Sequence, residues 1–142
     1  MEIINYLKIK EGIQTSGQPK VDDFAAIRVS GVHTVINLAM PDSETALSDE
    51  GKLVSENGMN YIHIPVVWKS PKEEQYTLFT SVMELHSKKS IWIHCALNWR
   101  VASFMYLYST KHLGIPEKEA RKNLESIWTP NKTWSEFIKN NS

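Results

Sequence analysis

Apolar residues in this chain alternate between short β-branched runs and longer stretches with helical spacing. Residues 32–38 form a run typical of a buried strand, whereas the apolar positions between Leu78 and Leu85 recur as on one face of a helix. The pattern predicts strands over residues 6–9, 13–15, 32–38, 61–65 and 90–94. It predicts helices over residues 21–29, 48–57, 72–86, 101–113, 116–128 and 130–139.

The first two predicted strands bracket a turn at Glu11-Gly12, but helices separate all the later ones. Strands joined through helices form a parallel sheet with right-handed crossovers. We therefore expect a three-layer α/β fold, with a central, mainly parallel sheet flanked by helices. In such sheets ligands bind beyond the carboxyl ends of the strands. The functional site is then expected among the loops that leave those ends, at residues 40–46, 66–72 and 95–100.

Size and composition indicate a single domain spanning residues 1–142. The 16 basic and 16 acidic side chains balance, which gives no support for electrostatic binding to nucleic acid or to an anionic membrane. The amino terminus lacks the pattern of a secretory signal, and no run reaches the roughly 18 apolar residues of a membrane span. We therefore expect a cytoplasmic protein whose single cysteine stays reduced.

The most informative segment is His94-Cys95-Ala96-Leu97-Asn98-Trp99-Arg100, which places the only cysteine between a predicted strand and a predicted helix. Unpaired N–H groups and the helix dipole at such a junction bind anions and favour a thiolate. The Arg100 guanidinium can hold two oxygens of an oxyanion. A lone cysteine is often only a small buried hydrophobe. Together with the loop and Arg100, however, Cys95 predicts nucleophilic chemistry on a phosphate-like or sulfur-centred group.

Several segments, taken in order, resemble the tyrosine/dual-specificity phosphatase superfamily, in particular its small bacterial members. They are Ser16-Gly17-Gln18-Pro19, Val35-Ile36-Asn37-Leu38, Ile64-Pro65-Val66, His94-Cys95 with Arg100, and Ile127-Trp128-Thr129-Pro130-Asn131 with Trp134. The resemblance implies a cysteine phosphatase fold with the phosphate loop between a strand and a helix. It implies that the Cys95 thiolate attacks phosphorus while Arg100 holds the equatorial oxygens, and that a carboxylic acid on a neighbouring loop protonates the leaving oxygen.

The resemblance also assigns roles around the loop. It implies that Ala96, Leu97, Asn98 and Trp99 bind the substrate and that His94 orients the loop. For His94 the alternative is a hydrogen-bonded core histidine at a strand end. The expected partner is a phosphorylated small molecule or a phosphoprotein. For Asn98 we expect a left-handed backbone conformation, which asparagine tolerates in tight loops. The other histidines, at positions 33, 63, 86 and 112, show no shared ligand spacing, so we expect neither a metal nor another cofactor.

Three departures from the superfamily pattern predict weak or atypical activity. Four residues, rather than the usual five, separate Cys95 from Arg100, and Val101 stands where the superfamily has Ser or Thr. The segment 66–71 contains no carboxylate. Asp42 is then the first candidate for the general acid, with Glu44 and Glu73 as alternatives. Because a missing general acid costs roughly 10²–10⁴-fold in rate, we expect turnover only of esters with good leaving groups.

Two other functions remain open from the sequence. Rhodanese-like sulfurtransferases carry a cysteine loop of this shorter length and hold a persulfide in it. A catalytically impaired phosphate-binding or adaptor module would keep the loop while lacking the acid and the hydroxyl. The segments outside the loop resemble the phosphatases better than the rhodanese pattern.

Overall fold

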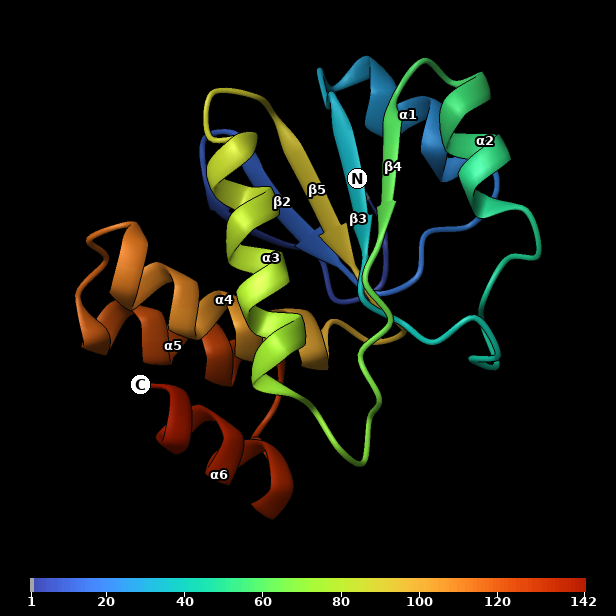
Figure 1. Ribbon diagram of the computed structural model, residues 1–142. Coiled ribbons are helices and arrows are strands. Elements are labelled where there is room, and N and C mark those ends of the chain that lie inside the picture. The colour runs from blue at the N-terminus through green and yellow to red at the C-terminus, as the bar shows by residue number, and fades with distance from the viewer. Residues whose placement is uncertain (1) are drawn as a thin grey trace.

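The computed structural model describes residues 2–142, and its five strands form one sheet in the order β1–β2–β5–β3–β4 (Figure 1). The strands are β1 (Leu7–Lys10), β2 (Ile13–Ser16), β3 (Thr34–Asn37), β4 (Asn60–His63) and β5 (Ile91–His94). The helices are α1 (Asp23–Val29), α2 (Glu50–Glu56), α3 (Glu73–Leu85), α4 (Trp99–His112), α5 (Glu117–Ile127) and α6 (Lys132–Asn141).

The sheet is mixed but mainly parallel. β1 and β2 form an antiparallel hairpin around Gly12, whose φ of 87° suits a tight turn. The pairs β2–β5, β5–β3 and β3–β4 are all parallel. The expected α/β fold is therefore confirmed, and β5 lies in the middle of the sheet, where its carboxyl end is flanked by β2 and β3.

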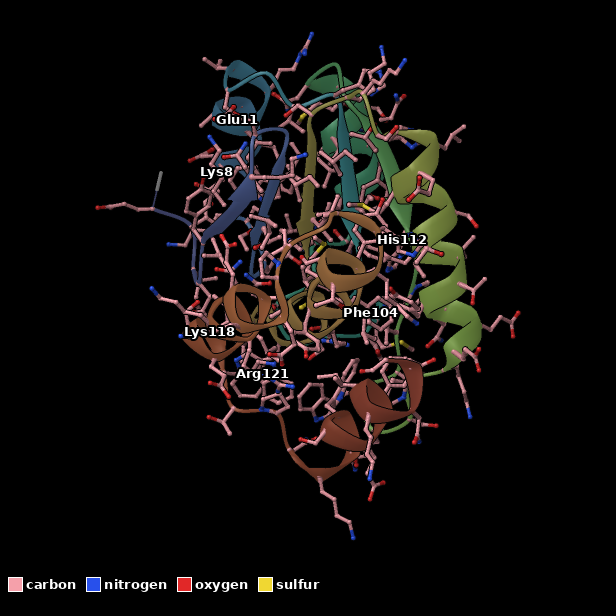
Figure 2. The ribbon with its side chains drawn as sticks, turned by 90° about the vertical axis from the view of Figure 1, so that its left-hand side faces the viewer. Lys8, Glu11, Phe104, His112, Lys118 and Arg121 are labelled. Carbon is pink, nitrogen blue, oxygen red and sulfur yellow. The ribbon has the colours of Figure 1, made fainter. Side chains whose placement is uncertain are left out.

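Helices cover both faces of the sheet, which makes three layers. Successive strand residues point to opposite faces, so Val35 and Trp92 pack against α1 and α2, while Ile36 and Ile93 pack against the other helices. On that second side the ring of Phe104 of α4, labelled in Figure 2, stacks on the ring of Phe137 of α6. None of the described helices is long and apolar enough to cross a membrane.

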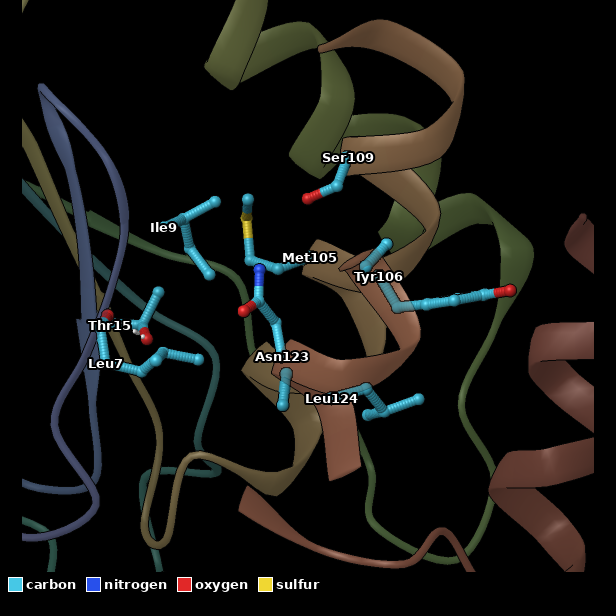
Figure 3. A pocket seen from close by; sticks show the side chains of 10 residues that line it. Leu7, Ile9, Thr15, Met105, Tyr106, Ser109, Asn123 and Leu124 are labelled. Carbon is cyan, nitrogen blue, oxygen red and sulfur yellow. Dashed lines mark hydrogen bonds between the residues drawn. The ribbon is translucent and has the colours of Figure 1, made fainter. Parts of the chain in front are cut away.

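Element boundaries differ from the predicted ones by a few residues. α4 begins at Trp99 rather than at residue 101, so Arg100 lies in its first turn. α2 begins at Glu50 rather than at residue 48, because residues 48–49 form a turn. A cavity of about 10 Å³ lies between the hairpin and helices α4 and α5 (Figure 3), at the lower limit for one water molecule. This cavity is a packing gap and not a ligand site.

Candidate active site

The segment from Cys95 to Arg100 connects the central strand β5 to α4. Cys95 follows β5 directly, and Arg100 lies in the first turn of α4. The run of four buried residues in β5 fixes the strand in the core, so the loop leaves from a rigid support. The geometry expected at this junction, with a thiol at the amino end of a helix, is therefore present.

A hollow of about 240 Å³ opens over this segment. Its walls come from the loop and from the segment after β4: Trp68, Cys95, Ala96, Leu97, Trp99 and Arg100. The Cys95 side chain is only 1% exposed and Arg100 is 7% exposed, so both line the hollow from below its rim. The structure thus brings five of the residues singled out in the sequence to one small site.

Three consecutive carbonyl groups of the loop, those of residues 95, 96 and 97, face hydrogen-bond donors outside it. Their partners, in order, are His94 Nδ1 (3.2 Å), the Gln18 N–H (3.0 Å) and Asn5 Nδ2 (2.9 Å). In a planar trans peptide the next N–H points opposite to the carbonyl. The N–H groups of residues 96–98 therefore point away from these supports.

The N–H groups of residues 96–100 have no acceptor among residues 2–142. Those at the start of α4 also carry the positive end of the helix dipole. Unpaired N–H groups at a helix amino terminus form a site for an anion. The backbone of this loop can therefore receive the oxygens of a phosphate-like group beside the Cys95 sulfur.

Asn98 shapes the loop through its backbone and anchors it through its side chain. Its φ of 69° confirms the expected left-handed conformation. The side-chain Nδ2 donates to the Asn5 carbonyl at 2.8 Å and to Thr15 Oγ1 at 3.0 Å. Because the side chain is turned away from the hollow, Asn98 can contribute only its backbone to a bound group.

Arg100 is held at one edge by the segment after β4. Its Nη1 donates to the Val66 carbonyl at 2.9 Å, and the guanidinium lies 5.8 Å from the ring centroid of Trp68. Trp68 is in turn held by Trp134 of α6, whose Nε1 donates to the Trp68 carbonyl at 2.9 Å. The guanidinium is thus fixed in the wall of the hollow with further N–H groups left for a ligand.

His94 and Glu50 form a buried pair that the sequence analysis missed. Glu50 Oε2 lies 2.6 Å from His94 Nε2, and Glu50 Oε1 accepts from Gln18 Nε2 at 2.7 Å. Glu50 is 4% exposed, although it stands in the first turn of a helix. The only hint in the sequence was Gln18, in one of the segments that carried the resemblance.

The proposed acids lie elsewhere. Asp42, Glu44 and Glu73 are exposed, and of residues 2–142 no carboxylate lines the hollow. The Ser103 hydroxyl bonds the Trp99 carbonyl at 2.9 Å within its own helix, so it does not replace the hydroxyl that Val101 lacks. Among the described residues, no cluster of three or more His, Cys, Asp or Glu could hold a metal ion.

No family model matches the chain, and no curated protein matches it. Among solved structures it is similar to a DUF442 candidate phosphatase from Shewanella putrefaciens CN-32, with 32% identity over 99% of this chain and 90% of that chain and a TM-score of 0.88.

More distant structures share the fold. The core catalytic domain of the PP-IP phosphatase SIW14 from S. cerevisiae aligns with a TM-score of 0.81 at 13% identity, over 100% of this chain and 88% of that chain. TpbA from P. aeruginosa aligns with a TM-score of 0.75 at 13% identity, over 96% and 84%. Because it is 32% identical to the Shewanella protein over nearly its whole length, the chain belongs to the DUF442 family, and it shares its fold with cysteine-based tyrosine/dual-specificity-like phosphatases.

Proposed function

We propose that this protein is a cysteine-dependent phosphatase that hydrolyses phosphoesters through a cysteinyl-phosphate. The observation that carries the proposal is the loop itself: Cys95, Arg100 and the unpaired N–H groups of residues 96–100 belong to one segment lining one hollow. A nucleophile and preorganised donors at one site are what phosphoryl transfer requires.

In the proposed reaction the Cys95 thiolate attacks phosphorus, so that an S–P bond forms and the ester P–O bond breaks. The departing oxygen takes the bonding electron pair and a proton from solvent water. Water then attacks phosphorus, the S–P bond breaks, and orthophosphate leaves with the thiolate restored. Arg100 and the loop N–H groups hold the non-bridging oxygens, which carry the negative charge in both steps.

Protonation of the leaving oxygen limits this reaction. No carboxylate among residues 2–142 lines the hollow, and Val101 supplies no hydroxyl to the departing thiolate. For Asp42 to serve as the general acid, its loop would have to move over the hollow when the substrate binds. We therefore expect slow turnover that favours esters with acidic leaving groups.

A second hollow offers room for the organic part of the ester. It has about 560 Å³ and shares Ala96 and Leu97 with the first. Leu97, 37% exposed, and Ile4, 51% exposed, contribute apolar surface to it, next to the charged side chains of Glu2, Lys20 and Asp23. The substrate class that fits is a phosphoester, in a small molecule or a phosphoprotein, with an apolar group next to the phosphate.

The decisive experiment compares p-nitrophenyl phosphate turnover by the wild type and by Cys95→Ser and Arg100→Lys. Cys95→Ser should abolish turnover, and Arg100→Lys should lower kcat by about 10²–10³-fold, because a bidentate clamp is lost. Thiocyanate formation from thiosulfate and cyanide, without phosphate release, would instead support the sulfurtransferase alternative. Phosphate release that persists in Cys95→Ser would refute the proposal.

A phosphate-binding module without turnover is the second candidate. The observations that favour it are Val101 and the lack of a carboxylate at the hollow. A ligand that binds only the folded state raises the melting temperature. Stabilisation by tungstate without any Cys95-dependent turnover would identify the chain as such a module.

A further inference from the structure

Glu50 is unusual for an acidic residue in the first turn of a helix, because its side chain is buried. Its side chain is 4% exposed, and its two oxygens bond two different parts of the chain, His94 of β5 and Gln18 after β2. Buried carboxylates are costly unless they are paired and hydrogen-bonded. Glu50 and His94 are 44 residues apart in the sequence, and the fold brings them together in its interior. This burial indicates a role other than keeping the protein soluble.

The two partners of Glu50 are also two of the three supports of the Cys95 loop. His94 Nδ1 faces the Cys95 carbonyl, and the Gln18 N–H donates to the Ala96 carbonyl. These two carbonyls belong to consecutive peptide groups. Their orientation fixes where the N–H groups of Ala96 and Leu97 point.

The hydrogen on His94 Nδ1 can be assigned from its partner, because a carbonyl oxygen only accepts and the contact to Cys95 therefore requires a donor. The other ring nitrogen, Nε2, faces Glu50 Oε2 at 2.6 Å. Tyr61 of β4 is a further titratable group beside Glu50, and burial raises its pKa to about 12, so it stays neutral. Among residues 2–142, His94 is the one ion-pair partner of Glu50.

We infer that Glu50 is a positioning residue of the Cys95 loop. Its carboxylate orients His94 and Gln18, and these hold two consecutive loop peptides with their N–H groups free for an anion. Glu50 touches neither the hollow nor a bound group, and it acts only through its two neighbours. The inference deepens the proposed function, and it rests on that function only where turnover is concerned.

The test uses readouts that do not require turnover: the Kd for tungstate and the rate at which iodoacetamide alkylates Cys95. Glu50→Met removes both hydrogen bonds at similar size and should weaken tungstate binding by about 10–100-fold, the equivalent of hydrogen bonds to a charged group. Glu50→Gln can still bridge the same two atoms and should bind within about fivefold of the wild type. Alkylation should slow in Glu50→Met and recover in Glu50→Gln.

Glu56→Met is the matched control, because Glu56 lies on the same helix, is exposed and pairs only with Lys52 at 3.8 Å. It should match the wild type in both readouts. If Glu50→Met does not fold, Gln18→Met takes its place. That variant removes the amide donor to Glu50 but keeps the backbone N–H to Ala96, and it should weaken tungstate binding about threefold or more.

Three results would overturn the inference. One is a folded Glu50→Met, or in its absence Gln18→Met, that binds tungstate and alkylates like the wild type. Another is Glu50→Gln losing as much as Glu50→Met, since the charge rather than the bridging geometry would then matter. The third is a wild-type Cys95 that reacts like the thiol of the unfolded chain. Loss of phosphatase turnover alone would concern the proposed function and not Glu50.

Discussion

Gly17 lies so close to Ala96 that a Cβ at position 17 would stand 2.6 Å from the Ala96 carbonyl oxygen and 2.7 Å from Ile4 Cγ2. The neighbouring Gln18 N–H donates to the same carbonyl at 3.0 Å. The segment after β2 therefore supports the Cys95 loop through its backbone. This contact explains why a glycine stands there.

Gly17→Ala should displace the loop, because a methyl group has no room between the Ala96 carbonyl and the Ile4 side chain. We expect a loss of about 1–3 kcal/mol in the free energy of unfolding, as for overpacked sites. Urea denaturation measures that loss, and tungstate binding reports whether the loop has moved. A variant as stable as the wild type and with the same Kd would show that the loop accommodates the methyl group.

Asn98 should tolerate glycine better than alanine. Both changes remove the hydrogen bonds to the Asn5 carbonyl and Thr15 Oγ1, but only alanine adds strain at a φ of 69°. A left-handed conformation costs a residue with a Cβ about 1–2 kcal/mol. Urea unfolding should therefore rank the wild type above Asn98→Gly and Asn98→Gly above Asn98→Ala. Equal stabilities of the two variants would contradict this order.

Local pattern was sufficient for the elements and for the two residues at the centre of the site. The strand before Cys95 and the helix that includes Arg100 are continuous in sequence, so their periodicity predicted the junction at which both residues lie. The left-handed conformation of Asn98 followed from its residue type and its place in a tight loop. These features depend on neighbours along the chain, which a sequence displays directly.

The supports of the loop could not be found in this way, because they come from distant segments. Asn5 reaches the Leu97 carbonyl across 92 positions. Glu50 stands in a polar stretch, between Asp49 and Gly51, which by itself predicts a solvated helix start. Only the packing of α2 against the sheet buries Glu50. The burial of a single polar residue leaves no periodic pattern in the sequence.

The indole N–H of Trp134 should matter more than that of Trp128. Trp134 Nε1 donates to the Trp68 carbonyl at 2.9 Å, whereas the buried Nε1 of Trp128 has no partner among the described residues. Trp134→Phe should therefore lose about 1 kcal/mol more stability than Trp128→Phe, the value of one hydrogen bond. Thermal or urea unfolding of the matched pair measures the difference. Equal losses would mean that the smaller ring, and not the lost hydrogen bond, accounts for the lower stability.

Removing the Tyr76 hydroxyl should reduce the loss of stability at high pH. The Tyr76 hydroxyl is buried and has no hydrogen-bond partner among residues 2–142, and burial raises its pKa from 10.0 to about 12. The pKa of Tyr76 is higher in the folded chain than in the unfolded chain. The neutral hydroxyl therefore contributes stability below pH 10 that is lost as the pH rises from 10 to 12. Tyr76→Phe should flatten that part of the stability profile. At neutral pH the free energy of unfolding of Tyr76→Phe should equal that of the wild type or exceed it by up to about 1 kcal/mol.

Turnover should depend steeply on the leaving group, because the hollow offers the departing oxygen no carboxylic acid among residues 2–142. Relative to an aryl phosphate, an alkyl phosphate should react slower by at least the roughly 10²–10⁴-fold that a general acid contributes. Asp42→Asn should leave the p-nitrophenyl phosphate rate within about twofold, because that leaving group needs no acid. If Asp42→Asn instead lowers alkyl phosphate turnover a hundredfold or so, the loop at residues 40–46 must close over Cys95 during the reaction. Measuring both substrates with both proteins separates these outcomes.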